Sequence, residues 1–149
     1  MKWSFRQIEM NDSEKVFNWR NSPEVYRYMF HSGPVALEDH QRWMKKVISD
    51  KSVLFLMASY DGHDVGTVRF DFKDDFSEAE VGIYLAPEFH GKGLGTEMLL
   101  ETEKIAKERV GTLKKIVARV VPENAFSEKM FSKTGYQKKF IQLEKILES

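Results

Sequence analysis

The sequence predicts an α/β fold in which helices flank a mixed central sheet, and three observations lead to this class. A nearly all-apolar run at 53–59 is typical of a strand covered on both faces. An alternating pattern at 79–86 leads through a glycine-rich turn into a long amphipathic segment, and a further apolar strand pattern follows at 113–121. A strand, a crossover helix and a strand in this order usually make the two strands parallel.

Length and composition limit the class of protein. The 149 residues suffice for a single domain, 1–149, with a sizeable core. The absence of cysteine excludes disulfides, thiolate nucleophiles and cysteine-ligated zinc. Lys plus Arg balance Asp plus Glu at 23 each, so no overall basic charge indicates nucleic acid. Because no apolar leader or membrane-length apolar run is present, we expect a cytoplasmic protein without membrane contact.

The N-terminal part predicts an edge strand followed by helices. An edge strand is expected at 2–9, and capping residues at 11–14 indicate that a helix begins there. Pro23 interrupts this helix, because a proline biases the preceding residue away from helical angles. Apolar residues then recur at helical spacing across 36–49, with His40 on the same side.

The middle of the chain predicts a hairpin and a third strand. Asp61 and Gly62 form a turn signal between 53–59 and the alternating segment 65–73, which indicates an antiparallel pair. In the strand predicted at 79–86, the period of two places every second residue on one face. The polar face carries Glu80, Gly82 and Tyr84.

The C-terminal part predicts a helix at 93–110, a buried strand at 113–121 and a short helix that ends near Lys133. A last strand is expected to begin at Tyr136. The weak pattern of 140–147 suggests that the closing hairpin is short or lacks its last strand, which would leave a sheet edge suited to pairing in a homodimer.

The glycine-rich turn carries the functional prediction. Gly91, Gly93 and Gly95 stand at alternate positions, so successive backbone N–H groups can turn toward one point where the helix dipole is positive. The turn is therefore expected to hold an anion. Its spacing, with Lys92 inside the loop, fits neither the Rossmann nor the Walker motif.

Two segments resemble one known family. The loop 90–95 resembles the Arg/Gln-x-x-Gly-x-Gly/Ala pyrophosphate loop of the GNAT superfamily of N-acetyltransferases, with His90 at its first position. The block 121–136 resembles the family's Asn-x-x-Ala-x-x-Leu-Tyr-x-x-x-Gly-Phe motif. The resemblance implies a GNAT fold that uses acetyl-CoA without a metal. Its cofactor contacts transfer to Ile83, Tyr84, Leu85, His90, Gly91, Lys92, Gly93, Leu94, Gly95, Thr96, Asn124 and Ser127. Asn124 is also interpretable as a plain helix N-cap.

The chemistry that the resemblance implies is direct attack of a primary amine on the acetyl thioester, so a base is expected near the amine. Glu80 is the first candidate, because it shares a strand face with Tyr84 shortly before the loop. His40 is the alternative base or a substrate ligand. The plainer interpretations are a solvated carboxylate for Glu80 and a packing residue for His40.

Phe131 departs from the family pattern. Many members have a tyrosine there that protonates the leaving thiolate, and phenylalanine has no proton to give. Ser127, Tyr84, Tyr136 and solvent remain as candidates for the general acid.

The acceptor amine is suggested by the N-terminal part. The run 19–25 and the run 37–43 resemble the UDP-amino-sugar N-acetyltransferases of pseudaminic acid biosynthesis. The resemblance implies that Arg20, His40 and Tyr84 face the nucleotide sugar, with Arg20 on its diphosphate. Two other classes remain open: an acetyltransferase of protein N-termini, as in ribosomal-protein enzymes, and a non-catalytic acyl-CoA-binding module.

Overall fold

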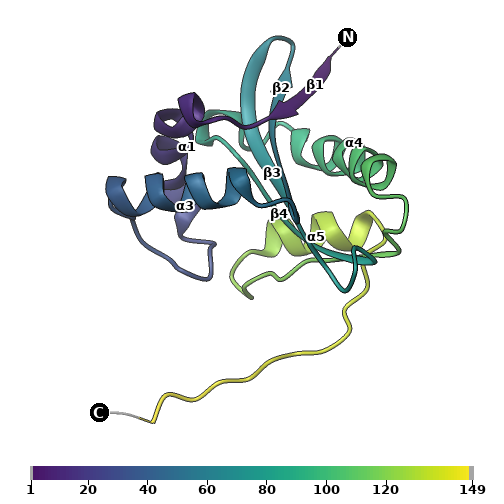
Figure 1. The fold of residues 1–149 in the computed structure, drawn as a ribbon. Helices are drawn as coiled ribbons and strands as arrows, with labels where there is room; N and C mark the ends of the chain where they lie inside the picture. The colour runs from purple at the N-terminus through teal and green to yellow at the C-terminus, as the bar shows by residue number, and fades with distance from the viewer. Residues whose placement is uncertain (1, 148–149) are drawn as a thin grey trace.

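A computed structural model of the chain describes residues 2–147 and shows a five-stranded sheet with helices on both faces (Figure 1). The strands lie in the sheet in chain order: β1 (Trp3–Gln7), β2 (Val53–Tyr60), β3 (His63–Lys73), β4 (Glu78–Leu85) and β5 (Lys115–Val117). The pairs from β1 to β4 are antiparallel, whereas β5 is parallel to β4. The predicted α/β class with a mixed sheet is confirmed.

The helices divide between the two faces of the sheet. They are α1 (Ser13–Arg20), α2 (Pro23–Tyr26), α3 (Leu37–Ser49), α4 (Leu94–Arg109) and α5 (Ala125–Lys133), with short 3-10 turns η1 (Met10–Asp12) and η2 (Pro87–Phe89). Side chains from α1 and α3 pack on one face, and side chains from α4 and α5 pack on the other. We refer to these as the α1/α3 face and the α4/α5 face.

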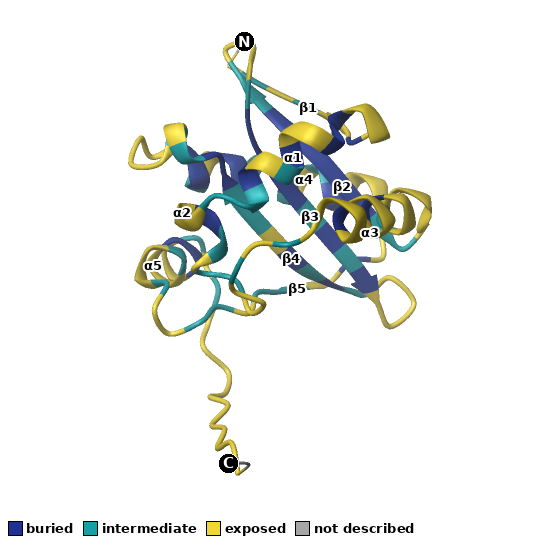
Figure 2. Ribbon diagram, turned by 90° about the vertical axis from the view of Figure 1, so that its left-hand side faces the viewer, coloured by how far each residue is buried: buried dark blue, intermediate teal, exposed yellow. Residues whose placement is uncertain are grey.

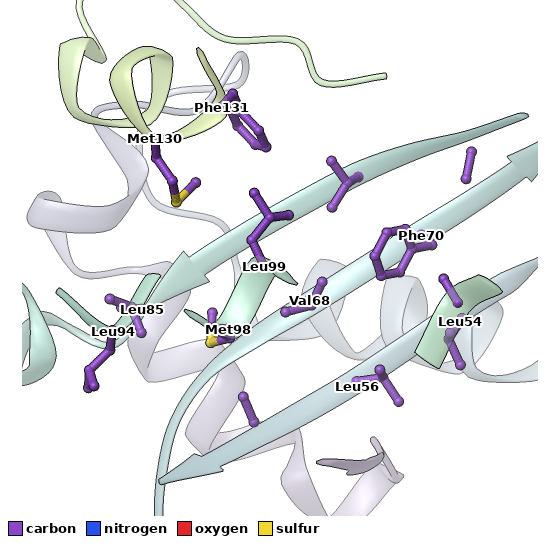
Figure 3. Packing of buried hydrophobic residues seen from close by; sticks show 14 of the residues in the cluster. Leu54, Leu56, Val68, Phe70, Leu85, Leu94, Met98, Leu99, Met130 and Phe131 are labelled. Carbon is purple, nitrogen blue, oxygen red and sulfur yellow. The ribbon is translucent and has the colours of Figure 1, made fainter. Parts of the chain in front are cut away.

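The larger core lies on the α4/α5 face (Figure 3). The alternation of β4 sends Val81 and Leu85 to this side, where they meet apolar residues of the two helices. Gly95 lets α4 come close, because a Cβ there would lie 3.3 Å from Met130 Sδ. The first turn of α4 is thereby fixed against the end of β4.

Two boundaries differ from the sequence-based expectation. The strand expected at 113–121 is a strand only at Lys115–Val117, because its pairing with β4 ends there. The last strand expected from Tyr136 is wrong within the described residues, since 137–147 form no helix or strand. That segment leaves the sheet and is coloured almost entirely as exposed (Figure 2).

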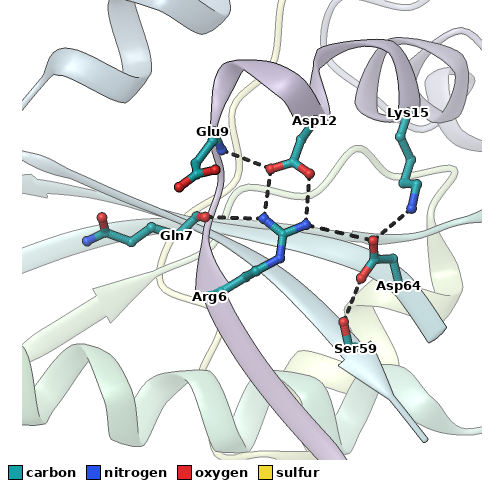
Figure 4. A network of polar contacts seen from close by, with 7 residues as sticks. All are labelled: Arg6, Gln7, Glu9, Asp12, Lys15, Ser59 and Asp64. Carbon is teal, nitrogen blue, oxygen red and sulfur yellow. Dashed lines mark hydrogen bonds and ion pairs between the residues drawn. The ribbon is translucent and has the colours of Figure 1, made fainter. Parts of the chain in front are cut away.

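An ion-pair network ties the N-terminal strand to the first helix and the hairpin (Figure 4). Arg6 donates from both guanidinium NH2 groups to Asp12, at 2.8 and 2.9 Å. Asp64 on β3 accepts from Lys15 at 2.7 Å and from Ser59 at 2.6 Å. The network fixes η1 and α1 beside the sheet. Arg20, the last residue of α1, lies near Tyr84 on the polar face of β4.

We expect Asp12→Asn to lower the free energy of unfolding by about 1–3 kcal/mol, because it weakens charged hydrogen bonds of a largely buried carboxylate. The hydrogen bonds from Arg6 outweigh burial and hold the pKa of Asp12 below its usual value. This contribution is present above the unfolded pKa and is lost as the pH falls through the lower folded pKa. Urea titrations should therefore show a wild-type advantage at pH 6 that shrinks as the pH falls below about 4. An advantage independent of pH would contradict the assignment.

Within residues 2–147, no helix is both long and apolar enough to cross a membrane. The same residues contain no cluster of three or more His, Cys, Asp or Glu side chains placed to hold a metal ion.

Candidate active site

The sheet opens between β4 and β5. The parallel pairs are Glu78 with Lys115, Ala79 with Ile116 and Glu80 with Val117, and the described pairing ends there. Residues 81–85 of β4 still pair with β3 on the other side. We refer to the unpaired edge of 81–85 as the β4–β5 opening, and Glu80 lies at its closed end.

Backbone amides line the β4–β5 opening. The Ala86 N–H donates to Val65 O of β3 at 2.8 Å, so the alternation of an antiparallel strand turns the N–H groups of Ile83 and Leu85 away from β3. Gly66 allows β3 to lie very close to β4 there, because a Cβ at this position would lie 2.3 Å from Tyr84 O. Two fixed donors therefore face the side on which a thioester carbonyl would need polarising.

The glycine loop continues directly from this opening. His90 Nε2 lies 2.8 Å from Leu85 O, which ties the loop to the end of β4. Gly91 and Gly93 have φ of 76° and 75°, and Gly93 is the N-cap of α4. A Cβ at either glycine would meet no atom within 4 Å, so the loop backbone is open to a ligand. The arrangement fits a pyrophosphate on the N-terminus of α4.

The other predicted cofactor residues surround this loop or lie on α5. Leu94 is buried in the core, so only its backbone could meet a ligand, and Lys92 Nζ lies 5.6 Å from the Phe89 ring centre. Thr96 is partly buried in the first turn of α4. Asn124 caps α5, since its Oδ1 accepts from the Ser127 N–H at 3.1 Å. The capping role is thus present, and the Asn124 side-chain NH2 group remains as a donor.

Phe131 and Tyr136 form an edge-on aromatic pair in the core, with ring centres 4.9 Å apart. The Tyr136 hydroxyl donates to Glu103 Oε2 on α4 at 2.5 Å. Burial raises the pKa of Tyr136, and Glu103 raises it further. Phe131 therefore lies in the hydrophobic core, and the hydroxyl of Tyr136 is already used on α4.

The polar face of β4 lies on the α1/α3 face, as its alternation predicts. Glu80 accepts from Lys73 at 3.0 Å and from Arg119 at 2.9 Å. Burial would raise the pKa of Glu80, but these hydrogen bonds and the two positive charges together lower it below the usual value. Glu80 is therefore a carboxylate at neutral pH.

Arg20 and Tyr84 come together on this face. The Arg20 guanidinium donates to His31 O at 2.9 Å and to Gly33 O at 3.0 Å, which fixes the loop that follows α2. Burial raises the pKa of Tyr84 to about 12, despite a hydrogen bond with Thr67 and the nearby charge of Arg20. Tyr84 therefore keeps its proton at neutral pH and can donate to a ligand.

His40 lies inside the helical layer. It is 4% exposed, its Nε2 lies 3.2 Å from Ser13 O, and its ring packs 5.3 Å from Phe17 and 5.8 Å from Trp43. Burial lowers its pKa and the charge of Arg20 lowers it further, so the ring is neutral at pH 7. These surroundings are those of a residue packed between α1 and α3.

Sequence reasoning missed two arginines of this face. Arg69 is paired across the sheet with Gly82, donates to Asp71 at 3.1 Å and lies 5.5 Å from the Trp43 ring centre. Arg119 lies 5.0 Å from the Phe30 ring centre. The period of two in 65–73 could have placed Arg69 opposite Gly82, whereas no local signal connects Arg119 with a residue 39 positions earlier.

Comparison with known proteins agrees with this geometry. Residues 3–137 match the family of acetyltransferase (GNAT) domains. The acetyltransferase PseH of Campylobacter jejuni strain 81-176 is 27% identical over 135 residues, which cover 89% of this chain and 82% of that protein. The spermidine N(1)-acetyltransferase of Escherichia coli K12 is 28% identical over 135 residues, covering 88% of this chain and 70% of that protein.

A solved structure shows the same fold with a ligand present. The crystal structure of spermidine N-acetyltransferase from Vibrio cholerae, in complex with CoA and spermine, superposes with a TM-score of 0.86 at 20% identity. The alignment covers 98% of this chain and 87% of that one. With its sheet, glycine loop and family match in agreement, the chain belongs to the GNAT family of acetyl-CoA-dependent N-acetyltransferases.

Proposed function

We propose that this enzyme transfers an acetyl group from acetyl-CoA to the 4-amino group of a UDP-4-amino-4,6-dideoxy-N-acetyl sugar. One observation carries the choice of acceptor. Three successive residues on the polar face of β4 each have an arginine near them: Glu80 has Arg119, Gly82 has Arg69, and Tyr84 has Arg20. Guanidinium groups bind diphosphates with paired hydrogen bonds. We refer to Arg20, Arg69 and Arg119 as the arginine row.

The surroundings of the arginine row also suit a nucleotide sugar. A Cβ at Gly82 would meet no atom within 4 Å, so the strand there is open to a bound group. Trp43 is 37% exposed and Phe30 is 59% exposed, and each lies beside an arginine of the row. Such aromatic surfaces can stack on a nucleobase or a sugar. The similarity to acetyltransferase PseH supports the same substrate class.

The arginine row argues against the other acceptors. A polyamine such as spermidine carries several positive charges, and Arg20, whose partners are neutral backbone carbonyls, would repel it. A peptide needs an open groove, but the loop after α2 is tied down over this face. Asn21 exchanges two hydrogen bonds of 2.9 Å with Val35, and Arg20 holds His31 and Gly33. The loop held in this way favours a compact acceptor.

In the proposed reaction, Glu80 accepts the proton of the attacking amine, directly or through one water. It lies at the closed end of the β4–β5 opening beside Arg119, on the same strand as the amides of Ile83 and Leu85. Those amides and the glycine loop would hold the thioester and the pyrophosphate of acetyl-CoA. The enzyme is also proposed to work as a homodimer.

The first test measures release of free CoA thiol from acetyl-CoA with three acceptors offered separately: the UDP-4-amino sugar, spermidine and a panel of N-terminal peptides. We expect turnover with the nucleotide sugar alone. Turnover only with peptides, or only with spermidine, would overturn the proposed acceptor and leave the family intact. Retained CoA binding without turnover on any acceptor would support a non-catalytic acyl-CoA-binding module.

We expect Arg20→Ala to raise the KM for the nucleotide sugar about 10- to 100-fold while leaving the KM for acetyl-CoA within about twofold. The lost guanidinium also frees the loop at 31–33, so a matched control is needed. Asn21→Ala frees the same loop through Val35 without removing a charge. Equal effects of the two variants on the nucleotide sugar would show that Arg20 acts only on the loop.

A further inference from the structure

A primary amine of the protein itself lies on the proposed base. Lys73, the last residue of β3, donates from Nζ to Glu80 Oε1 at 3.0 Å. The Lys73 side chain is 50% exposed, whereas that of Glu80 is 20% exposed. The amine is therefore accessible to solvent, while the carboxylate that holds it lies at the closed end of the β4–β5 opening.

The Lys73 side chain extends along β4 toward this opening. In the sheet register Lys73 stands opposite Glu78, yet its amine contacts Glu80, which is two residues nearer the opening. Glu78 is paired instead with Lys115 of β5, at 3.1 Å. Since two residues of a strand span roughly 6–7 Å, the amine of Lys73 is carried by that distance in the direction of residues 81–85.

The amine is held beside Glu80 without being fixed there. Arg119 donates to the second oxygen of the carboxylate, Oε2, at 2.9 Å. Glu80 therefore keeps a charged partner when the lysine turns away. A lysine side chain has a flexible four-carbon stem, so its amine can move while the backbone of β3 stays in place. The Lys73 amine thus has the position and the freedom of an acceptor.

We propose that the enzyme acetylates its own Lys73 when acetyl-CoA is bound and no acceptor is present. The inference rests on the proposed function, because it uses Glu80 as the base and the β4–β5 opening as the site of the thioester. A free acceptor amine would take the place beside Glu80 that Lys73 holds in this structure. The two amines therefore compete for one carboxylate.

The step balances without a further reactant. The Lys73 ammonium first gives one proton to water, and the electron pair on Nζ then attacks the carbonyl carbon of the thioester. As the C–N bond forms, the C–S bond breaks and CoA leaves as a thiolate, which takes a proton from solvent. Glu80 accepts the second proton of the amine and passes it to solvent. The products are Nε-acetyl-lysine, CoA and one released proton.

Mass spectrometry of proteolytic peptides tests the inference on the purified chain given acetyl-CoA alone. Lys115 is the internal control, because it also lies on a glutamate of β4 and its side chain is 67% exposed against 50% for Lys73. Uncatalysed acetylation would therefore favour Lys115. We expect Lys73 to be acetylated at least about tenfold faster, with a rate constant independent of protein concentration. Equal rates at the two lysines, or a rate constant that rises with protein concentration, would overturn the proposal.

Two further readouts separate the enzymatic reaction from the intrinsic reactivity of the lysine. Glu80→Gln should lower acetylation of Lys73 by about tenfold or more and leave that of Lys115 unchanged. In wild-type protein, an excess of free CoA should have the same effect, because it competes with acetyl-CoA for the β4–β5 opening. Unchanged acetylation of Lys73 in either experiment contradicts the inference.

A last measurement separates this inference from the choice of acceptor. The same preparation is given the UDP-4-amino sugar together with acetyl-CoA, and turnover of the sugar should suppress acetylation of Lys73. Acetylation of Lys73 without any turnover of the sugar would support the inference and overturn the proposed acceptor. Turnover of the sugar by an enzyme whose Lys73 stays unmodified when the sugar is withheld would overturn the inference alone.

Discussion

Replacing Gly93 with valine is expected to weaken acetyl-CoA binding by about 100-fold or more. Gly93 has φ of 75° at the N-cap of α4, and a β-branched residue is strongly disfavoured there. The loop would rebuild with other angles, so its N–H groups would no longer converge on the pyrophosphate. The measurement is calorimetric titration of acetyl-CoA into the folded variant.

A second variant, at Gly62, tests whether the loss of acetyl-CoA affinity comes from backbone strain alone. Gly62 has φ of 85° in the hairpin turn between β2 and β3, and a Cβ there would likewise meet nothing within 4 Å. Gly62→Val therefore introduces comparable backbone strain away from the loop. It should lower the unfolding temperature while keeping affinity for acetyl-CoA. Unchanged affinity in Gly93→Val, or equal losses in both variants, would remove the loop as the anion site.

The fold could be predicted where local patterns were decisive. The turn at Asp61 and Gly62 has φ of 50° and 85°, the conformation that this residue pair favours, and it produces the predicted hairpin. The strand, helix and strand of the second half gave the parallel pair of β4 and β5. Each of these predictions depends on short local patterns in the sequence.

The errors occurred where the structure of a segment depends on partners that are distant in the sequence. The segment after Tyr136 has apolar residues without a regular period, and no strand in the same chain pairs with it in the described structure. Its structure therefore depends on what covers it, which a local pattern does not contain. β5 was overestimated for a related reason, since apolar content continues to Val121 while pairing ends at Val117.

Only part of the candidate site could be predicted from the sequence, because some of its contacts join residues that are distant in the chain. The glycine loop and Asn124 could be predicted, because a few neighbouring residues determine the geometry of a turn or a helix cap. Burial of His40 against Phe17 and Trp43 depends on how α1 packs on α3, so its surroundings could not be read from its own helix. The partnership of Glu80 with Arg119 exists only after β5 has joined the sheet.

Glu80→Gln is expected to lower kcat by about 10²- to 10⁴-fold and to leave acetyl-CoA affinity nearly unchanged, if Glu80 is the base of the proposed reaction. Glutamine preserves the size of the side chain and can accept one of its two hydrogen bonds, from Lys73 or from Arg119, but it cannot accept the proton of the attacking amine. The two readouts are steady-state turnover with the preferred acceptor and calorimetric binding of acetyl-CoA.

Glu78 offers a matched control. It lies two residues earlier on the same face of β4, pairs with Lys115 at 3.1 Å, and its side chain is 22% exposed against 20% for Glu80. Glu78→Gln therefore removes a similar paired charge at a site beyond the closed end of the opening. We expect its turnover to stay within about twofold of wild type, so that a loss confined to Glu80→Gln reports on proton acceptance.

The pH dependence distinguishes a base from a carboxylate that only holds Arg119. Because the pKa of Glu80 lies below its usual value, the carboxylate stays ionised down to acidic pH. The rise of kcat/KM with pH in wild type should therefore follow deprotonation of the amine, not of Glu80. In Glu80→Gln the proton must leave to solvent, so activity should recover in part as hydroxide concentration rises. Normal turnover of Glu80→Gln at every pH would remove Glu80 as the base, and Arg119→Gln would then be the variant that tests its structural role.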